Sequence, residues 1–172
     1  MELMDVMLQR RSIRRYTDEP VPEEKLEKIL QAGLLAPTSK NRRPCEFYVV
    51  NDRETLDALS NVKVANGEML RKATAAIAVF GDTNKADTWI EDSSIALAFM
   101  HLMAKDQGVG SCWVQMHLRK DSDGRDAEDN VREIMDVPDS YRIVGILSLG
   151  MPAEERPARD LEKLEYHKIH RG

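Results

Sequence analysis

The chain has 172 residues, enough for one domain with a single buried core, and a multidomain organisation is not expected. Hydrophobic residues make up 42% of the sequence and charged residues 32%, which is typical of globular proteins and excludes disordered or fibrous classes. The formal net charge of −5 argues against nucleic acid as a partner, because a polyanion would be repelled.

No apolar run approaches the ~18 residues that span a bilayer, and the first residues lack the cationic flank and apolar stretch of a secretory signal. We therefore expect a cytoplasmic protein without a membrane partner. The two cysteines, Cys45 and Cys112, are expected to be free thiols in a reducing compartment.

Hydrophobic periodicity predicts helices and strands in mixed order. Apolar spacing from Leu3 predicts a short helix that ends at Arg10, and Pro22 with the two acids after it begins a second helix that ends before Pro37. Short apolar, β-branched or aromatic runs predict strands at 46–50, 75–80, 111–115 and 143–150. Further helices are predicted at about 52–60, 86–107 and 131–135. Helices and strands are mixed, and two helices in succession precede the first strand, which favours an α+β fold over a doubly wound one.

The helix predicted at 86–107 has no polar face over part of its length. Nine of the ten residues 95–104 are apolar, so this part must either cross the middle of the core or lie in a subunit interface. Because 172 residues can hardly surround such a helix, we expect an oligomer. The mostly polar segment 151–172 has only sparse apolar residues, a pattern typical of an arm that lies on a neighbouring subunit.

Two short segments concentrate positive charge in this acidic protein. Four of the six residues 10–15 are arginines, and three of the four residues 40–43 are cationic. This clustering predicts a local anion site. The segment 10–15 follows the C-terminal end of a helix, which repels anions, so it should bind through guanidinium and hydroxyl groups on extended chain.

The sequence has no recognisable arrangement of the side chains that usually carry catalysis. None of the four histidines (His101, His117, His167 and His170) has a carboxylate or cysteine at metal-ligand spacing, so no metal site is predicted. Cys45 has no adjacent histidine and is not expected to be a nucleophile. The motifs of serine hydrolases, phosphate-loop enzymes and Rossmann dehydrogenases are also absent. An enzyme of this kind would borrow its reactivity from an organic cofactor, with no catalytic side chain of its own.

Three segments in register resemble the FMN-dependent nitroreductase family, in particular its shorter members. They are Arg10-Arg11-Ser12-Ile13-Arg14, the run from Pro37 to Pro44, and Gly108-Val109-Gly110-Ser111-Cys112-Trp113. The resemblance covers nearly the whole chain. It implies one FMN-binding domain over 1–172, with 151–172 as an extended C-terminal arm. The implied fold is a central, mostly antiparallel sheet flanked by helices, in an intertwined homodimer with flavin at the interface.

The resemblance also implies which residues bind FMN. Arg10, Arg11 and Ser12 would hold the phosphate and ribityl chain, and Arg14 would stabilise negative charge at N1 and O2 of the reduced ring. The backbone at Gly110 and Ser111 would face flavin N5. A loop of the other subunit would contact the flavin through Pro37, Thr38, Ser39 and Asn41.

Near the C-terminus, Arg159 matches a late basic residue at the phosphate, with Arg156 as the alternative. Two residues depart from the family pattern: Arg43 stands where glutamine is common, and Cys45 where tryptophan is common. These departures concern the side of the pocket that would receive substrate.

The activity that the resemblance implies is hydride transfer from NADH or NADPH to flavin N5. A nitroaromatic, quinone or similar small electrophile would then be reduced in a ping-pong cycle. Two alternatives stay open: a flavin-binding or interaction protein without turnover, and a specialised member of the dehalogenase or flavin-cleaving type. The sequence does not choose between NADH and NADPH or name the acceptor.

Overall fold

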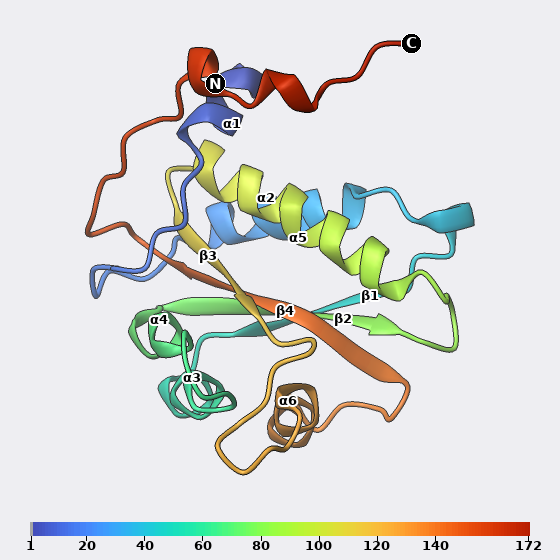
Figure 1. The fold of residues 1–172 in the computed structure, drawn as a ribbon. Coiled ribbons are helices and arrows are strands. Elements are labelled where there is room, and N and C mark those ends of the chain that lie inside the picture. Colours follow the sequence, from blue (N-terminus) through green and yellow to red (C-terminus); the bar gives the residue numbers. More distant parts are fainter. Residues whose placement is uncertain (1) are drawn as a thin grey trace.

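The computed structural model describes residues 2–172, which form one antiparallel sheet with helices on both faces (Figure 1). The strands are β1 (Cys45–Val50), β2 (Ala75–Asp82), β3 (Gly110–Gln115) and β4 (Tyr141–Gly150). Their order across the sheet is β1-β2-β4-β3, and every neighbouring pair is antiparallel. The predicted α+β fold with a central antiparallel sheet is confirmed.

The helices divide into two layers. The α-helices are α1 (Leu3–Gln9), α2 (Glu23–Leu35), α3 (Arg53–Ser60), α4 (Glu68–Lys72), α5 (Trp89–Asp106) and α6 (Ala127–Met135). Short 3-10 turns lie at Ser39–Asn41, Leu161–Lys163 and Tyr166–Lys168. Helices α2 and α5 cover one face of the sheet, and α3, α4 and α6 cover the other (Figure 1). Helix α4 is not among the helices that the sequence predicts.

Strand β2 lies at the centre because both of its faces are buried. Ala76, Ala78 and Phe80 pack with α3, α4 and α6, and the intervening Ile77 and Val79 pack with α2 and α5. This alternation has the two-residue period of a pleated strand. The sheet therefore separates two apolar cores, and the continuous apolar run predicted as a strand is explained by its double burial.

Helix α5 differs from its prediction at its start and on one side. It begins at Trp89 because the residues before it form turns, in which Asp82 accepts hydrogen bonds from the backbone of Asn84 and Ala86. Its inner side is fully buried, but Ile95 and Phe99 are 37% and 40% exposed. The helix does not run enclosed through the core of the subunit, and an apolar stripe on it is open.

Residues 10–15, called the arginine segment below, are extended, as predicted, and lie against the sheet. The backbone N–H of Ile13 donates to the carbonyl of Ser111 at 2.9 Å, next to the start of β3. Tyr16 forms a bridge with Pro152, just after β4. Its ring covers Gly150, and its hydroxyl donates to the Ile13 carbonyl and lies 2.8 Å from Ser148 Oγ.

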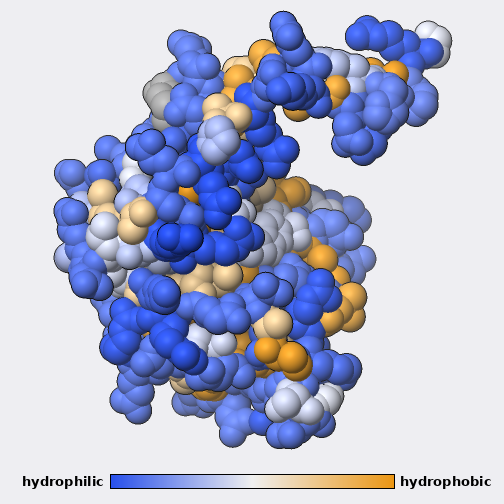
Figure 2. Space-filling view, turned by 60° about the vertical axis from the view of Figure 1, so that its left-hand side comes forward, coloured by the Kyte–Doolittle hydropathy of each residue, from blue (hydrophilic) through white to orange (hydrophobic). Residues whose placement is uncertain are grey.

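The chain after β4 turns back toward the N-terminus. The backbone N–H of Arg159 donates to the Leu8 carbonyl in α1 at 2.8 Å, and the last residues stand beside α1, away from the body (Figure 1). Figure 2 shows apolar side chains on this projecting segment. The exposed large apolar residues there are Leu161, Leu164, Tyr166 and Ile169. In residues 2–172, no helix combines the length and the apolar character needed to cross a membrane.

Replacement of Gly150 by alanine tests the contact between the arginine segment and the sheet. An added Cβ would lie 2.6 Å from Tyr16 Cγ and 2.7 Å from Tyr16 Cβ, atoms too close to the backbone to swing away. We expect Gly150→Ala to lower the free energy of unfolding by about 1–3 kcal/mol, measured by urea denaturation. Gly172→Ala is the control, since nothing lies within 4 Å of its added Cβ. Equal stability of both variants would show that this contact is not tight.

Candidate functional site

Five arginines from two distant parts of the sequence surround one small pocket. Its volume is about 220 Å³, and it is lined by Arg10, Arg11, Ser12, Arg14, Arg156 and Arg159. They meet because the extended segment after α1 runs beside the segment after β4, with the Ala153 N–H donating to the Arg15 carbonyl. The arginines that predicted an anion site therefore line a common pocket, and Arg156 and Arg159, the two alternatives near the C-terminus, both line it as well.

Positive charge in this pocket exceeds the negative charge around it. Burial lowers the pKa of Arg10, and the nearby Arg159 and Arg11 guanidinium groups lower it further. The carboxylate of Glu154 offsets part of this charge, because it accepts from the Arg14 N–H at 2.8 Å and pairs with Arg156 at 3.2 Å. The remaining excess favours a multiply charged anion such as a phosphate.

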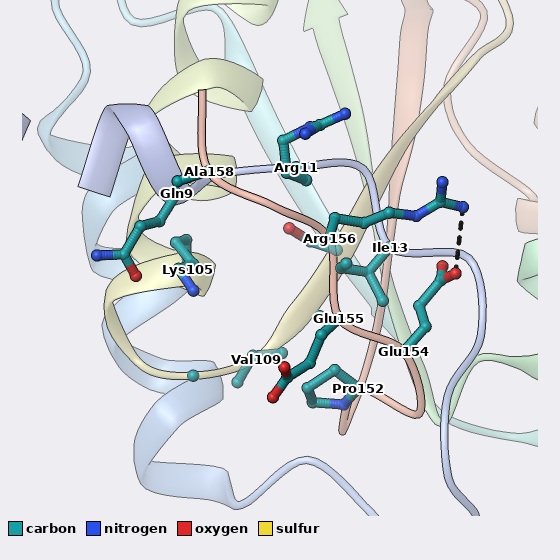
Figure 3. Close-up of a pocket in the computed structure, with 13 residues that line it drawn as sticks. Gln9, Arg11, Ile13, Lys105, Val109, Pro152, Glu154, Glu155, Arg156 and Ala158 are labelled. Atoms are coloured by element: carbon teal, nitrogen blue, oxygen red, sulfur yellow. Dashed lines mark hydrogen bonds and ion pairs between the residues drawn. The ribbon is translucent and has the colours of Figure 1, made fainter. Parts of the chain in front are cut away.

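A larger cavity adjoins the arginine pocket and shares Arg11 and Arg156 with it. Its volume is about 490 Å³. Figure 3 shows Arg11, Ile13, Lys105, Val109 and Pro152 around it, with the Glu154–Arg156 ion pair at one side. The remaining lining residues are Gln9, Gly108, Gly110, Ser111, Glu155 and Ala158. A ligand with an anionic end and a larger, less charged body could occupy both spaces at once.

The turn into β3 forms one wall of this cavity. Gly108 has φ of +70°, and β3 begins two residues later at Gly110. A Cβ on Gly110 would lie 3.0 Å from Ile13 Cγ2 and 3.1 Å from the Gly150 carbonyl, so only glycine fits without a shift. The Ser111 carbonyl faces the arginine segment. Because the N–H and C=O of one strand residue point to the same side, the Ser111 N–H faces that side as well.

His101 on α5 is a site residue that the sequence analysis missed. Its side chain is buried, with 6% exposed, between Arg10 Nη1 at 2.7 Å and Ser111 Oγ at 2.6 Å. Burial, with a contribution from the Arg10 charge, lowers its pKa from 6.5 to about 4, so the ring is neutral near pH 7. The sequence signal was slight: His101 is the one polar residue in the apolar run 95–104.

The loop predicted to contact the flavin lies away from the arginines of its own chain. The Ser39 N–H donates to Asp92 at the N-terminal turn of α5, at 2.9 Å. His101 is nine residues further along the helix, about 13 Å along its axis. One subunit therefore does not bring Pro37, Thr38, Ser39 and Asn41 to the arginine pocket.

The same loop is held in a strained conformation. Lys40, Asn41 and Arg43 have φ of 51°, 55° and 49°, a region that non-glycine residues seldom occupy. Thr38 Oγ1 accepts from the Arg43 N–H, and Asn41 Oδ1 accepts from Arg43 Nε. Arg43, one of the two departures from the family pattern, thus connects two of the predicted site residues.

Cys45, the other departure, has the environment of an unreactive thiol. Burial raises the pKa of Cys45 to about 11, and its sulfur lies 3.8 Å from Ser93 Oγ. The thiolate that a nucleophile requires is therefore scarce at neutral pH. Among residues 2–172, no group of three or more histidine, cysteine, aspartate or glutamate side chains is placed to hold a metal ion.

Solved structures of other proteins share this fold. A solved structure titled FMN-dependent nitroreductase, from Clostridium difficile R20291, superposes with a TM-score of 0.94 at 43% identity and covers 97% of each chain. A second, from Desulfovibrio desulfuricans, is described as a provisionally assigned nitroreductase in complex with FMN. It has a TM-score of 0.77 at 26% identity and covers 99% of each chain.

Sequence comparison also finds nitroreductases. An Archaeoglobus fulgidus protein, provisionally named NADH dehydrogenase/NAD(P)H nitroreductase, is 34% identical over 99% of this chain and 97% of its own. The model of the family described as Nitroreductase family matches residues 7–65 and 58–151. With its antiparallel sheet and its three motifs in register, the chain belongs to the nitroreductase family.

Proposed function

We propose that this protein is an FMN-dependent NAD(P)H oxidoreductase that reduces nitroaromatics, quinones or similar small electrophiles. The observation that carries the proposal is the pocket of five arginines, which opens beside a larger cavity bounded by Gly110 and Ser111. Support comes from the solved structures of similar chains, one titled FMN-dependent and another in complex with FMN.

The residues present fit the charge of FMN. A phosphate monoester carries about −1.5 to −2 at pH 7 and offers three acceptor oxygens. The arginine pocket offers guanidinium donors and the Ser12 hydroxyl to that group, and Arg159 and Arg10 repel each other in its absence. In this proposal the phosphate binds to Arg10, Arg11, Ser12 and Arg159, with Arg156 at the rim.

The chain would position the flavin and polarise its ring. When bound, FMN would accept a hydride from NADH or NADPH at N5 and pass it to the acceptor in a ping-pong cycle. The Ser111 N–H faces the side of β3 from which the ring would approach. The exposed guanidinium of Arg14 would hold positive charge near the pyrimidine edge and stabilise the reduced, anionic ring.

The proposal includes a homodimer that completes the site. Apolar residues on α5 and α2 are open in the single subunit, among them Ile95, Phe99, Leu34 and Leu35. Burial of such a stripe against a second copy would stabilise the pair by the hydrophobic effect. The loop with Thr38 and Asn41, which lies far from its own arginines, would then contact the flavin of the partner.

FMN uptake by purified protein tests the cofactor assignment. We expect a yellow protein with one FMN per subunit. Arg159→Ala should weaken FMN binding about tenfold or more, because one charge-assisted hydrogen bond to the phosphate is lost. The dissociation constant can be measured by quenching of flavin fluorescence. Comparison with the dissociation constant of Arg156→Ala shows which of the two arginines contributes more to FMN binding.

Arg119→Ala is the matched control for charge removal. Arg119 is exposed on the loop after β3, donates to the Leu118 carbonyl and does not line the arginine pocket. It should therefore leave FMN affinity unchanged. A colourless protein that takes up no FMN would end the assignment.

Reduction by nicotinamide nucleotides separates an enzyme from a flavin-binding protein without turnover. We expect NADH or NADPH to bleach the absorbance of bound FMN in a stopped-flow experiment, and a quinone to restore it. The preferred nucleotide is the one that bleaches faster at equal concentration. No bleaching with either nucleotide, in a protein that binds FMN, would favour the alternative without turnover.

A further inference from the structure

His101 joins the two parts of the candidate site. Its ring lies between Arg10, which lines the arginine pocket, and Ser111, which lines the larger cavity. Both contacts are short, at 2.7 and 2.6 Å, and the side chain is almost fully buried. The proposed chemistry does not use this histidine directly, so its polar contacts need another explanation.

The partners of His101 determine which ring nitrogen carries the proton. A guanidinium can only donate hydrogen bonds, so Nε2 of His101 must accept from Arg10. In the neutral ring the hydrogen is then on Nδ1 and is donated to Ser111 Oγ. Ser111 lines the larger cavity, and its hydroxyl hydrogen remains available to another acceptor.

The neutral state of His101 is required for this arrangement. A protonated ring would lose its acceptor at Nε2 and would place a second cation 2.7 Å from Arg10. Other cations lie close, since the charges of Arg159 and Arg11 also act on Arg10. Burial opposes protonation of the ring, and so the acceptor for Arg10 is retained.

We propose that His101 is a positioning residue that orients the Arg10 guanidinium toward the phosphate of the ligand. This inference rests on the proposed FMN site. A side chain that only filled the core at this point would need no hydrogen bonds, and leucine or phenylalanine would serve. Because His101 acts through Arg10, its removal should weaken binding of the phosphate end of the ligand and spare the ring end.

Riboflavin, which is FMN without the phosphate, is the probe that separates these two ends. We expect His101→Phe to weaken FMN binding about tenfold, the cost of one misplaced charge-assisted hydrogen bond, and to change riboflavin binding less than about twofold. A general structural defect would weaken both ligands equally. Equal losses, or none, would therefore overturn the proposal.

Two conservative variants locate the contact that matters. The amide of His101→Gln reaches the position of Nε2 and can accept from Arg10, whereas the amide of His101→Asn reaches only the position of Nδ1. We expect His101→Gln to retain FMN affinity within about threefold and His101→Asn to resemble His101→Phe. The reverse order would assign the effect to Ser111 and contradict a role through Arg10.

A double-mutant cycle with Arg10→Ala tests the coupling directly. If His101 acts through Arg10, His101→Phe should cost no further FMN affinity once Arg10 is removed. Additive losses would overturn the proposal. His117→Phe is the control, since His117 also makes a 2.6 Å hydrogen bond, but its partner, Glu128, does not line the arginine pocket as Arg10 does. It should leave the ratio of FMN to riboflavin affinity unchanged.

The outcomes distinguish this inference from the proposed function. Wild-type protein that binds no FMN would overturn both. Wild-type protein that binds FMN, with an unchanged FMN-to-riboflavin ratio in His101→Phe, would overturn only the role of His101. Nitrogen-15 NMR of unliganded wild-type protein adds a test that needs no variant to fold. It should show the Nδ1–H tautomer at pH 7, and an Nε2–H tautomer or an imidazolium would contradict the proposal.

Discussion

The concentration of five guanidinium groups around one pocket is the constraint that shapes the rest of this structure. Arg10, Arg11 and Arg14 come from one end of the chain and Arg156 and Arg159 from the other. Burial lowers the pKa of Arg10, and the nearby charges of Arg159 and Arg11 lower it further, so the unliganded protein holds this cation in an unfavourable place. Other interactions must therefore hold these charges close together in the unliganded protein.

Backbone hydrogen bonds hold the segment after α1 and the segment after β4 in place. The Ile13, Arg15 and Thr17 backbones bond to Ser111, Ala153 and Met151, and Arg159 bonds to Leu8 of α1. Tyr16 anchors the crossing, because its ring fills the space above Gly150 and its hydroxyl lies against Ser148 in the sheet. The edge of the antiparallel sheet thus fixes the positions of charges that would otherwise move apart. A bound phosphate would remove most of the repulsion and should stabilise the folded chain, since a ligand that binds only the native state does so by mass action.

Much of this arrangement could be predicted from the sequence, because the relevant signals are local. The extended state of the segment after α1, the glycine turn before β3 and the buried strands all follow from residue types at short spacing. The clustering of Arg10 to Arg14 predicted an anion site without any knowledge of the fold. Which late arginine joined it could not be predicted, because the path of the polar tail depends on a few backbone hydrogen bonds. The structure places both Arg156 and Arg159 in the pocket.

Other features could be recognised only in the folded structure. His101 looked like one more residue of an apolar helix, since its partners are 91 and 10 residues away in sequence. The loop with Thr38 and Asn41 shows its strained φ angles and its attachment to Asp92 only in the folded chain. The apolar run in α5 predicted a helix that one subunit can hardly cover, but the sequence did not show that Ile95 and Phe99 are the residues partly exposed in the single subunit.

Phosphorus-31 NMR of bound FMN is the most direct test of the central claim that the arginine pocket holds the phosphate. Free phosphate monoesters lose their second proton with a pKa of about 6, and several guanidinium groups in contact favour the dianion and lower that pKa. The account predicts a phosphorus signal whose chemical shift does not change between about pH 5 and pH 8. A bound signal that titrates near pH 6, as in free FMN, would contradict it.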